Sequence, residues 1–151
     1  MFSDNERMIL STLDDIKTSL ELIQKRCTNI KSSDDFLQND NGLEKLDSIS
    51  MRLIAIGEGF KNIDKLSDKK LLVNYPEIPW KEVKGIRDIL SHHYFDLDAE
   101  VIYEICKNDI KKLLDTTLDM IDEKLADKRL KDLEDGKEKL IPANEIFKSK
   151  D

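Results

Sequence analysis

The chain has 151 residues, of which 39% are hydrophobic and 38% are charged, and its formal net charge is −7. This length suits one domain with a single core, and the presence of only 5 glycines and 3 prolines argues against an all-β fold with many turns. The acidic balance excludes a sequence-independent nucleic-acid coat, which needs a basic surface, but it allows a local basic site that handles RNA.

The first predicted element is a long amphipathic helix over residues 8–30. Its apolar residues recur at steps of three and four and therefore share one face: Ile9, Leu13, Ile16, Leu20, Ile23, Cys27 and Ile30. Ser3 or Asp4 is the expected N-cap. Residues 1–11 lack a basic and then apolar leader, and no apolar run reaches the length of a membrane span. We therefore expect a soluble, cytoplasmic protein with no membrane contact.

The second predicted helix ends at Leu66 and follows a break at residues 32–35, whose side chains can cap it. The polar residues 39–42 delay or interrupt its start. Gly57 and Gly59 lie in its middle, where each glycine costs about 1 kcal/mol relative to alanine. Their position predicts that another backbone approaches this helix closely. Glu58, between them, is either a helix-packing feature or a partner of a functional site.

Residues 67–79 form the main connection, and Pro79 suits the start of a third helix from Trp80 to His92 or Tyr94. A turn at residues 95–98 leads into a fourth helix over residues 99–125, with Asp98 as its N-cap. Trp80 and Phe95 are expected to pack in the core or in a dimer rather than stack on bases. Residues 1–125 are thus predicted to form an all-α, up-and-down four-helix bundle.

The composition changes at residue 126 to alternating charge with sparse leucines. We predict that residues 126–151 form a second unit, a charged C-terminal extension that is helical or partly disordered. A last short helix is expected over residues 144–148.

The two cysteines, Cys27 and Cys106, have a spacing that matches no zinc site or redox pair. A disulfide between them is one interpretation. Two reduced thiols buried on packed helices are the favoured one.

Chemistry is concentrated at the end of the third predicted helix. The only histidines, His92 and His93, follow Arg87 and Asp88 closely. An imidazole can accept or return a proton near pH 7, and a guanidinium binds phosphate through a planar fork of donors. These groups suffice to cleave RNA by attack of its own 2′-hydroxyl, without a metal ion or cofactor. The same residues are also compatible with an ordinary polar helix end, where histidines favour the helix dipole.

Helix geometry adds a constraint on this group. On a regular helix Arg87 and Tyr94 share a face, whereas His92 points roughly 140° away from Arg87. A single helix therefore presents Arg87 and His92 awkwardly. This spacing favours a site that is shared between two copies of the chain.

Residues 78–98, with the sequence IPWKEVKGIRDILSHHYFDLD, resemble the HepT family of the HEPN superfamily. Arg87, His92 and Tyr94 match the family motif of an arginine, four residues, a histidine, one residue and a tyrosine. Asp88 departs from the asparagine that most often follows the arginine, which leaves its role the least defined. Residues 54–58 also resemble the family, and the whole resemblance covers about residues 8–125.

The resemblance implies the toxin of a toxin–antitoxin module, a metal-independent endoribonuclease that acts as a homodimer with the two motifs facing each other. Arg87 would hold the scissile phosphate and His92 would transfer protons, with Asp88 and His93 in supporting roles. The cognate antitoxin would be a minimal nucleotidyltransferase that transfers AMP from ATP to Tyr94. That adenylate would block the phosphate site by bulk and by charge. The alternative is a non-catalytic accessory subunit of the nucleotidyltransferase.

Overall fold

The computed structural model describes residues 2–93 and 96–136, and of residues 91–93 and 96–97 it describes the backbone. The chain forms α1 (Asp4–Cys27), α2 (Asp34–Leu37), α3 (Asp40–Leu66), a 3-10 turn η1 (Leu72–Asn74), α4 (Trp80–Lys84), α5 (Ile86–Leu90), β1 (Ser91–His93), β2 (Asp96–Leu97), α6 (Ala99–Asn108) and α7 (Ile110–Glu134). The predicted all-α bundle is confirmed for this part of the chain, since the two strands are only a short antiparallel pair.

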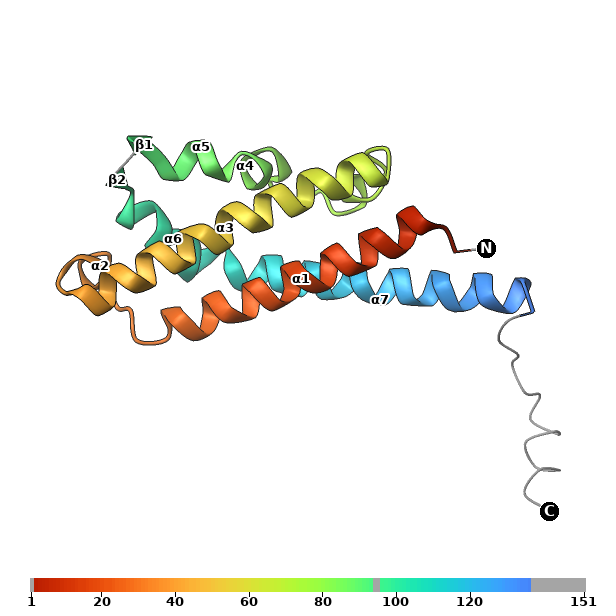
Figure 1. Ribbon diagram of the computed structural model, residues 1–151, viewed down its shortest axis with the longest axis horizontal. Coiled ribbons are helices and arrows are strands. Elements are labelled where there is room, and N and C mark those ends of the chain that lie inside the picture. The colour runs from red at the N-terminus through yellow and green to blue at the C-terminus, as the bar shows by residue number, and fades with distance from the viewer. Residues whose placement is uncertain (1, 94–95, 137–151) are drawn as a thin grey trace, which may run out of the picture.

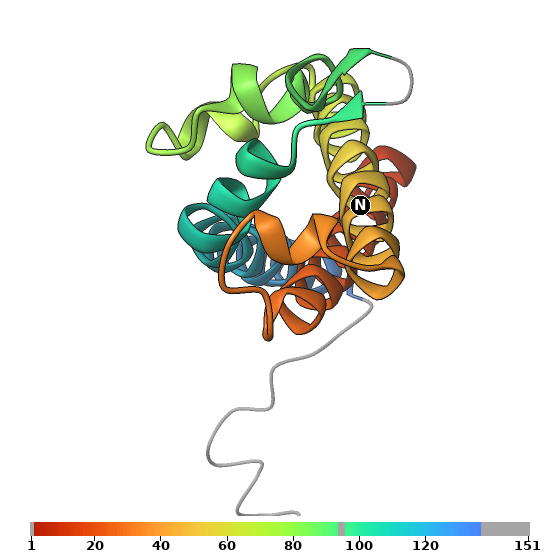
Figure 2. The ribbon, with the colours of Figure 1, turned by 90° about the vertical axis from the view of Figure 1, so that its left-hand side faces the viewer.

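Four helical positions build the bundle: α1, α3, the consecutive pair α4–α5, and the consecutive pair α6–α7. Figure 1 shows α1, α3 and α7 running along the molecule, with α4–α5 lying along α3. Viewed from one end, α3 lies between α1 and α4–α5, and α6 leads into α7 on the opposite side (Figure 2). The core between them is aliphatic and aromatic, and its fully buried side chains include Leu13, Leu20, Ile23, Ile49, Phe60 and Ile63.

The starts of the first two long helices are capped by their own side chains. The Ser3 Oγ accepts a hydrogen bond from the Glu6 backbone N–H at 3.1 Å, and the Ser3 N–H donates to the Glu6 carboxylate, so the predicted Ser3 cap is confirmed as a capping box. At α3, the Asn39 side chain accepts from the Gly42 N–H at 2.8 Å. The polar residues 39–42 are therefore the start of α3 and do not interrupt it.

The prediction that the third helix reaches His92 or Tyr94 is wrong, because the helix ends at Leu90. The Leu90 side chain is fully buried, and its carbonyl oxygen accepts from the Asp98 N–H at 3.3 Å. A continued helix would need this carbonyl to accept from an N–H four residues later. The chain instead turns back, so that Ser91 pairs with Leu97 and His93 pairs with Asp96.

The predicted single helix over residues 99–125 is two helices, α6 and α7, that meet at Asp109 with φ −112°. Asp98 caps α6 as expected, accepting from the Val101 N–H at 3.1 Å. The second helix, α7, passes residue 125 and continues to Glu134, where Lys131 Nζ donates to both carboxylate oxygens of Glu6 on α1 at 2.6 Å.

The predicted charged extension is therefore helical from residue 126 to Glu134. Its remaining part, with the short helix expected over residues 144–148, lies outside the described residues. The proposed domain boundary at residue 125 stays a prediction. Among the described helices, none combines the length and the apolar character that crossing a membrane requires.

Candidate functional site

The helix pair that carries Arg87 lies directly on the backbone of α3. At Gly57 an ideal Cβ would lie 2.7 Å from the Val83 carbonyl oxygen and 2.8 Å from the Ile86 Cγ2. A side chain at this position would push α4–α5 away, so the absence of one sets their distance from α3. The close backbone approach predicted from the two glycines is confirmed at Gly57, whereas Gly59 faces the Ile16 side chain of α1.

Two further contacts hold the start of this helix pair. Lys84 on α4 forms an ion pair with Asp64 on α3, and both side chains are mostly buried. The Trp80 ring packs on Phe60 with centroids 4.8 Å apart, and its indole N–H donates to the Tyr75 carbonyl at 2.9 Å. The prediction that Trp80 serves packing is confirmed. Phe95, for which the same was predicted, lies outside the described residues.

Arg87 and Asp88 lie on α5 with their side chains exposed. Leu90, two residues later, is fully buried and anchors the end of the helix in the core. Within the described part of the chain, neither the Arg87 guanidinium nor the Asp88 carboxylate makes a side-chain hydrogen bond or an ion pair. No described side chain therefore occupies the donors of Arg87.

His92 and His93 lie in β1, immediately after the buried end of α5. The pairing of β1 with β2 is irregular between Ser91 and His93, so that His92 occupies the irregular position of the strand. Tyr94, the predicted modification site, lies outside the described residues. The site that the sequence predicts thus spans a short helix and the antiparallel strand pair that follows it.

The helix end at Leu90 removes the reason, drawn from helical spacing, to expect a site shared between two chains. Arg87 and His92 belong to different elements, so the 140° rotation expected on one continuous helix does not apply. Arg87 and Tyr94 were expected to share one face of a helix. This expectation is wrong because the helix ends at Leu90. Support for a second copy has to come from the surface beside α5.

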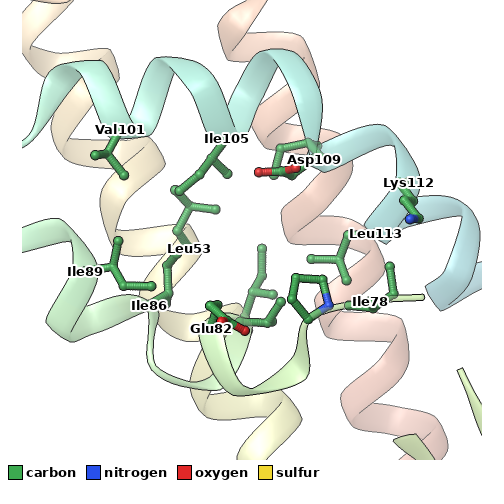
Figure 3. Close-up of a pocket in the computed structure, with 14 residues that line it drawn as sticks. Leu53, Ile78, Glu82, Ile86, Ile89, Val101, Ile105, Asp109, Lys112 and Leu113 are labelled. Atoms are coloured by element: carbon green, nitrogen blue, oxygen red, sulfur yellow. The ribbon is translucent and has the colours of Figure 1, made fainter. Parts of the chain in front are cut away.

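An apolar groove of about 350 Å³ lies on that surface, between α4–α5 and α6–α7. Figure 3 shows Ile86 and Ile89 of α5 directed across the groove toward Val101 and Ile105 of α6. These four side chains are only partly buried, although they are apolar. Glu82 lies at the rim, on the exposed side of α4.

This groove was not predicted from the sequence. A signal was present in α5, where three of five residues are apolar: Ile86, Ile89 and Leu90. These three residues are spaced three and four positions apart and therefore share one face of α5, on which only Leu90 is fully buried.

Glu58 does not belong to the site. Its side chain is exposed and pairs with Lys61 one turn later on α3, at 3.2 Å. Among the described residues, no group of three or more histidine, cysteine, aspartate and glutamate side chains is arranged to hold a metal ion.

A family model described as "Ribonuclease HepT-like" matches residues 16–120, which are more than two thirds of the chain. The chain is 38% identical over 101 residues to a Thermococcus cleftensis protein named "Probable ribonuclease HepT", covering 67% of this chain and 84% of that protein. It is 37% identical over 111 residues to a Methanocaldococcus jannaschii protein named "Gamma-glutamylcyclotransferase and putative RNase". No solved structure matches the chain.

The match to the Methanocaldococcus protein covers 74% of this chain but 46% of that relative, so the chain spans about half of its length. The matched residues 16–120 contain α5, β1 and β2, and hence Arg87 and His92. The resemblance stated from the motif is thereby confirmed, and with it the enzyme class at the level of the family, a ribonuclease of the HEPN type. The chain belongs to the HepT-like ribonuclease family.

Proposed function

We propose that the chain is the toxin of a toxin–antitoxin module, a metal-independent endoribonuclease whose composite site contains Arg87 and His92 from two copies. The observation that carries the proposal is the exposed guanidinium of Arg87 on α5, which pairs with no described carboxylate and lies five residues before His92. A surface arginine without a carboxylate partner among the described residues keeps its planar fork of donors for phosphate oxygens.

The reaction follows from the two groups. The imidazole of His92 takes the proton of a ribose 2′-hydroxyl, and the 2′-oxygen attacks the adjacent phosphorus. Arg87 donates to the non-bridging oxygens, where negative charge grows as the attack proceeds. The 5′-oxygen leaves with a proton from the protonated His92 imidazole of the other copy, and a 2′,3′-cyclic phosphate remains on the upstream fragment. The nucleophile belongs to the RNA, so the protein supplies positioning and proton transfer. Asp88 and His93 support these roles.

The apolar groove supports a homodimer. Ile86 and Ile89 flank Arg87 in the sequence and line the groove, so a second copy packed there lies next to the first copy's arginine. A two-fold contact of this kind repeats each residue on both sides and therefore supplies two arginines and two His92 side chains. It also covers aliphatic surface that the single chain leaves partly exposed.

We further propose that a minimal nucleotidyltransferase antitoxin neutralises the enzyme by transferring AMP from ATP to Tyr94. Tyr94 follows His92 by two residues, so an adenylate there lies within the segment that handles the RNA phosphate. Its phosphate carries negative charge and competes with RNA for Arg87. Incubation of the chain with that partner and ATP is expected to add the mass of one AMP, and Tyr94→Phe abolishes the addition.

The test of the nuclease compares purified wild type with Arg87→Ala and His92→Ala on total RNA in the presence of a chelator. Wild type is expected to produce fragments with 2′,3′-cyclic phosphate ends, and each variant is expected to lose at least about 100-fold in rate. Lys81→Ala is the matched control, because Lys81 is an exposed cation on the neighbouring helix. Equal cleavage by wild type and His92→Ala would overturn the proposal.

One observation favours the second candidate, a non-catalytic accessory subunit of the nucleotidyltransferase. The net charge of −7 repels RNA overall and suits a partner with a basic surface. In that case the purified chain leaves RNA intact, and Arg87→Ala alters the affinity for the nucleotidyltransferase alone.

A further inference from the structure

The end of α1 and the middle of α6 meet at a small thiol-lined cavity. Cys27 is the last residue of α1, and Cys106 lies on α6, 79 positions later (106 − 27). Both thiols are free and partly buried, and both line one cavity of about 120 Å³ together with Ile30, Tyr103 and Lys107.

This neighbourhood is held in place by hydrogen bonds on both sides of the cysteines. The Tyr103 hydroxyl, three residues before Cys106, donates to the Lys31 carbonyl at 2.7 Å. The Ile30 N–H donates to the Cys27 carbonyl at 3.0 Å. The backbone segments that carry the two thiols are therefore held beside the same cavity, and a disulfide requires their Cα atoms to lie within about 7 Å of each other.

We propose that Cys27 and Cys106 form a reversible dithiol–disulfide site that reacts with small disulfide oxidants, with Cys27 as the attacking thiol and Cys106 as the resolving thiol. Neither cysteine lines the apolar groove beside α5, and the thiol site does not depend on the proposed nuclease activity.

The surroundings distinguish the two thiols. The Cys106 S–H donates to Cys27, which lowers the pKa of the Cys27 thiol; burial opposes this effect and nearby Lys45 adds to it. The same hydrogen bond, together with burial, raises the pKa of Cys106. The thiolate is the nucleophile in disulfide exchange, so Cys27 reacts first and Cys106 follows when Cys27 is already bonded.

The exchange balances with glutathione disulfide as the oxidant. The Cys27 thiolate attacks one sulfur of glutathione disulfide, and a protein–glutathione disulfide forms while one glutathione thiolate leaves and takes a proton. Cys106 then loses its proton and attacks the Cys27 sulfur, which displaces the second glutathione. The protein loses two hydrogen atoms in total, and one glutathione disulfide is reduced to two glutathione molecules.

The test incubates the full-length protein with glutathione disulfide and follows its intact mass and its melting temperature. We expect the loss of two hydrogens with no lasting glutathione adduct, and a peptide map that links Cys27 to Cys106. The new bond closes a loop of roughly 80 residues and should raise the melting temperature by about 10 °C, and a reductant should reverse both changes. Persistent glutathione adducts on wild type, disulfide-linked dimers, or unreacted thiols overturn the proposal.

Single variants test the order of attack. Cys106→Ser keeps a hydroxyl donor beside Cys27 and is expected to accumulate a stable glutathione adduct on Cys27. Cys27→Ser keeps a polar neighbour for Cys106, and Cys106 should then react at least about 10-fold more slowly. Lys45→Gln should slow the reaction of Cys27 several-fold without changing the helical circular dichroism. Equal rates for the two single-cysteine variants, or a faster Cys106, overturn the assignment of Cys27 as the attacking thiol.

Discussion

The bundle formed by α1, α3 and α7 and the site-bearing segment from α4 to β2 are built in different ways. Inward-facing side chains of the bundle are fully buried over most of its length, as at Leu13, Leu20 and Ile63. On α5 only Leu90 is fully buried, while Ile86 and Ile89 are partly exposed and Arg87 is exposed. The buried apolar side chains that stabilise the fold are therefore mainly in the bundle. The site-bearing segment packs against α3 and buries fewer of its side chains.

The largest expected effect is a difference in the free energy of unfolding between a core substitution in the bundle and a substitution in the site-bearing segment. Leu13→Ala removes a fully buried side chain on α1 and should lower the free energy of unfolding by about 2–5 kcal/mol, because it loses apolar burial and leaves a cavity. Ile89→Ala on α5 is the counterpart in the site-bearing segment, since Ile89 is only partly buried, and should cost about 1 kcal/mol or less. Urea unfolding measures both, and equal costs would contradict the comparison.

The contact between α3 and the helix pair α4–α5 should be disrupted by a substitution at Gly57. Gly57→Ala places a Cβ against the Val83 carbonyl and should cost about 1–3 kcal/mol through overpacking. Because α4–α5 must shift, RNA cleavage should fall further than stability does, since a displacement near 1 Å can cost about 100-fold in rate.

Gly59→Ala is the matched variant on the same helix. Its Cβ would meet the end of the flexible Ile16 side chain at 3.0 Å, and alanine gains about 1 kcal/mol of helix propensity. The two effects nearly cancel, so stability and cleavage should stay close to wild type. If both glycine variants behave alike, Gly57 does not set the position of the site.

The difference between the regions also explains what the sequence could predict. Long helices with one buried face repeat their apolar residues every three or four positions, so α1 and α3 were predictable, as was the Ser3 cap. In the site segment, the helix end at Leu90 depends on the Asp98 N–H, eight residues away. No local pattern encodes that hydrogen bond. The break at Asp109 likewise interrupts an apolar period that continues on both sides.

The sequence predicted which residues could carry the chemistry of the candidate site, but it predicted their arrangement in space less well. Arg87 and Asp88 are exposed on a helix as the motif suggested, and residues 16–120 match the expected family. The strand that carries His92, and the groove beside Ile89, follow from how α4–α5 packs on α3. That packing depends on tertiary contacts. A five-residue helix is too short for its apolar periodicity to predict them.

The groove can be tested apart from the fold. Ile89→Asp puts a charge on its apolar wall and should abolish the proposed homodimer at micromolar concentration, because an unpaired carboxylate would be buried at the contact. The single chain should lose at most about 1 kcal/mol, since Ile89 is already partly exposed. Sedimentation velocity measures the association, and Met51→Asp, at a position on α3 that is 67% exposed, is the control. An intact dimer in Ile89→Asp would remove the groove as the contact surface.

The smallest expected effect lies at the far end of the bundle, where α7 continues beyond residue 125. Burial raises the pKa of the Glu6 carboxyl, but the hydrogen bond and charge of Lys131, with the Ser3 bonds, outweigh it and hold the pKa below its usual value. A carboxyl whose pKa is lowered by folding stabilises the protein above its unfolded pKa of about 4.3. This contribution is lost as the pH falls through that value and then through the lower folded pKa.

Glu6→Gln should therefore flatten the acid limb of the stability curve by about 1 kcal/mol or less, because Lys131 is 36% exposed and solvent screens the pair. Lys131→Met keeps the aliphatic stem beside Phe2 and should flatten the same limb. If the Glu6–Lys131 pair causes the effect, the double variant should flatten the acid limb of the stability curve by the same amount as Glu6→Gln alone. Glu6→Gln should exceed Lys131→Met only by the contribution of the Ser3 hydrogen bonds. Additive effects of the two substitutions would mean that residues 126–134 are not held to α1 by this contact.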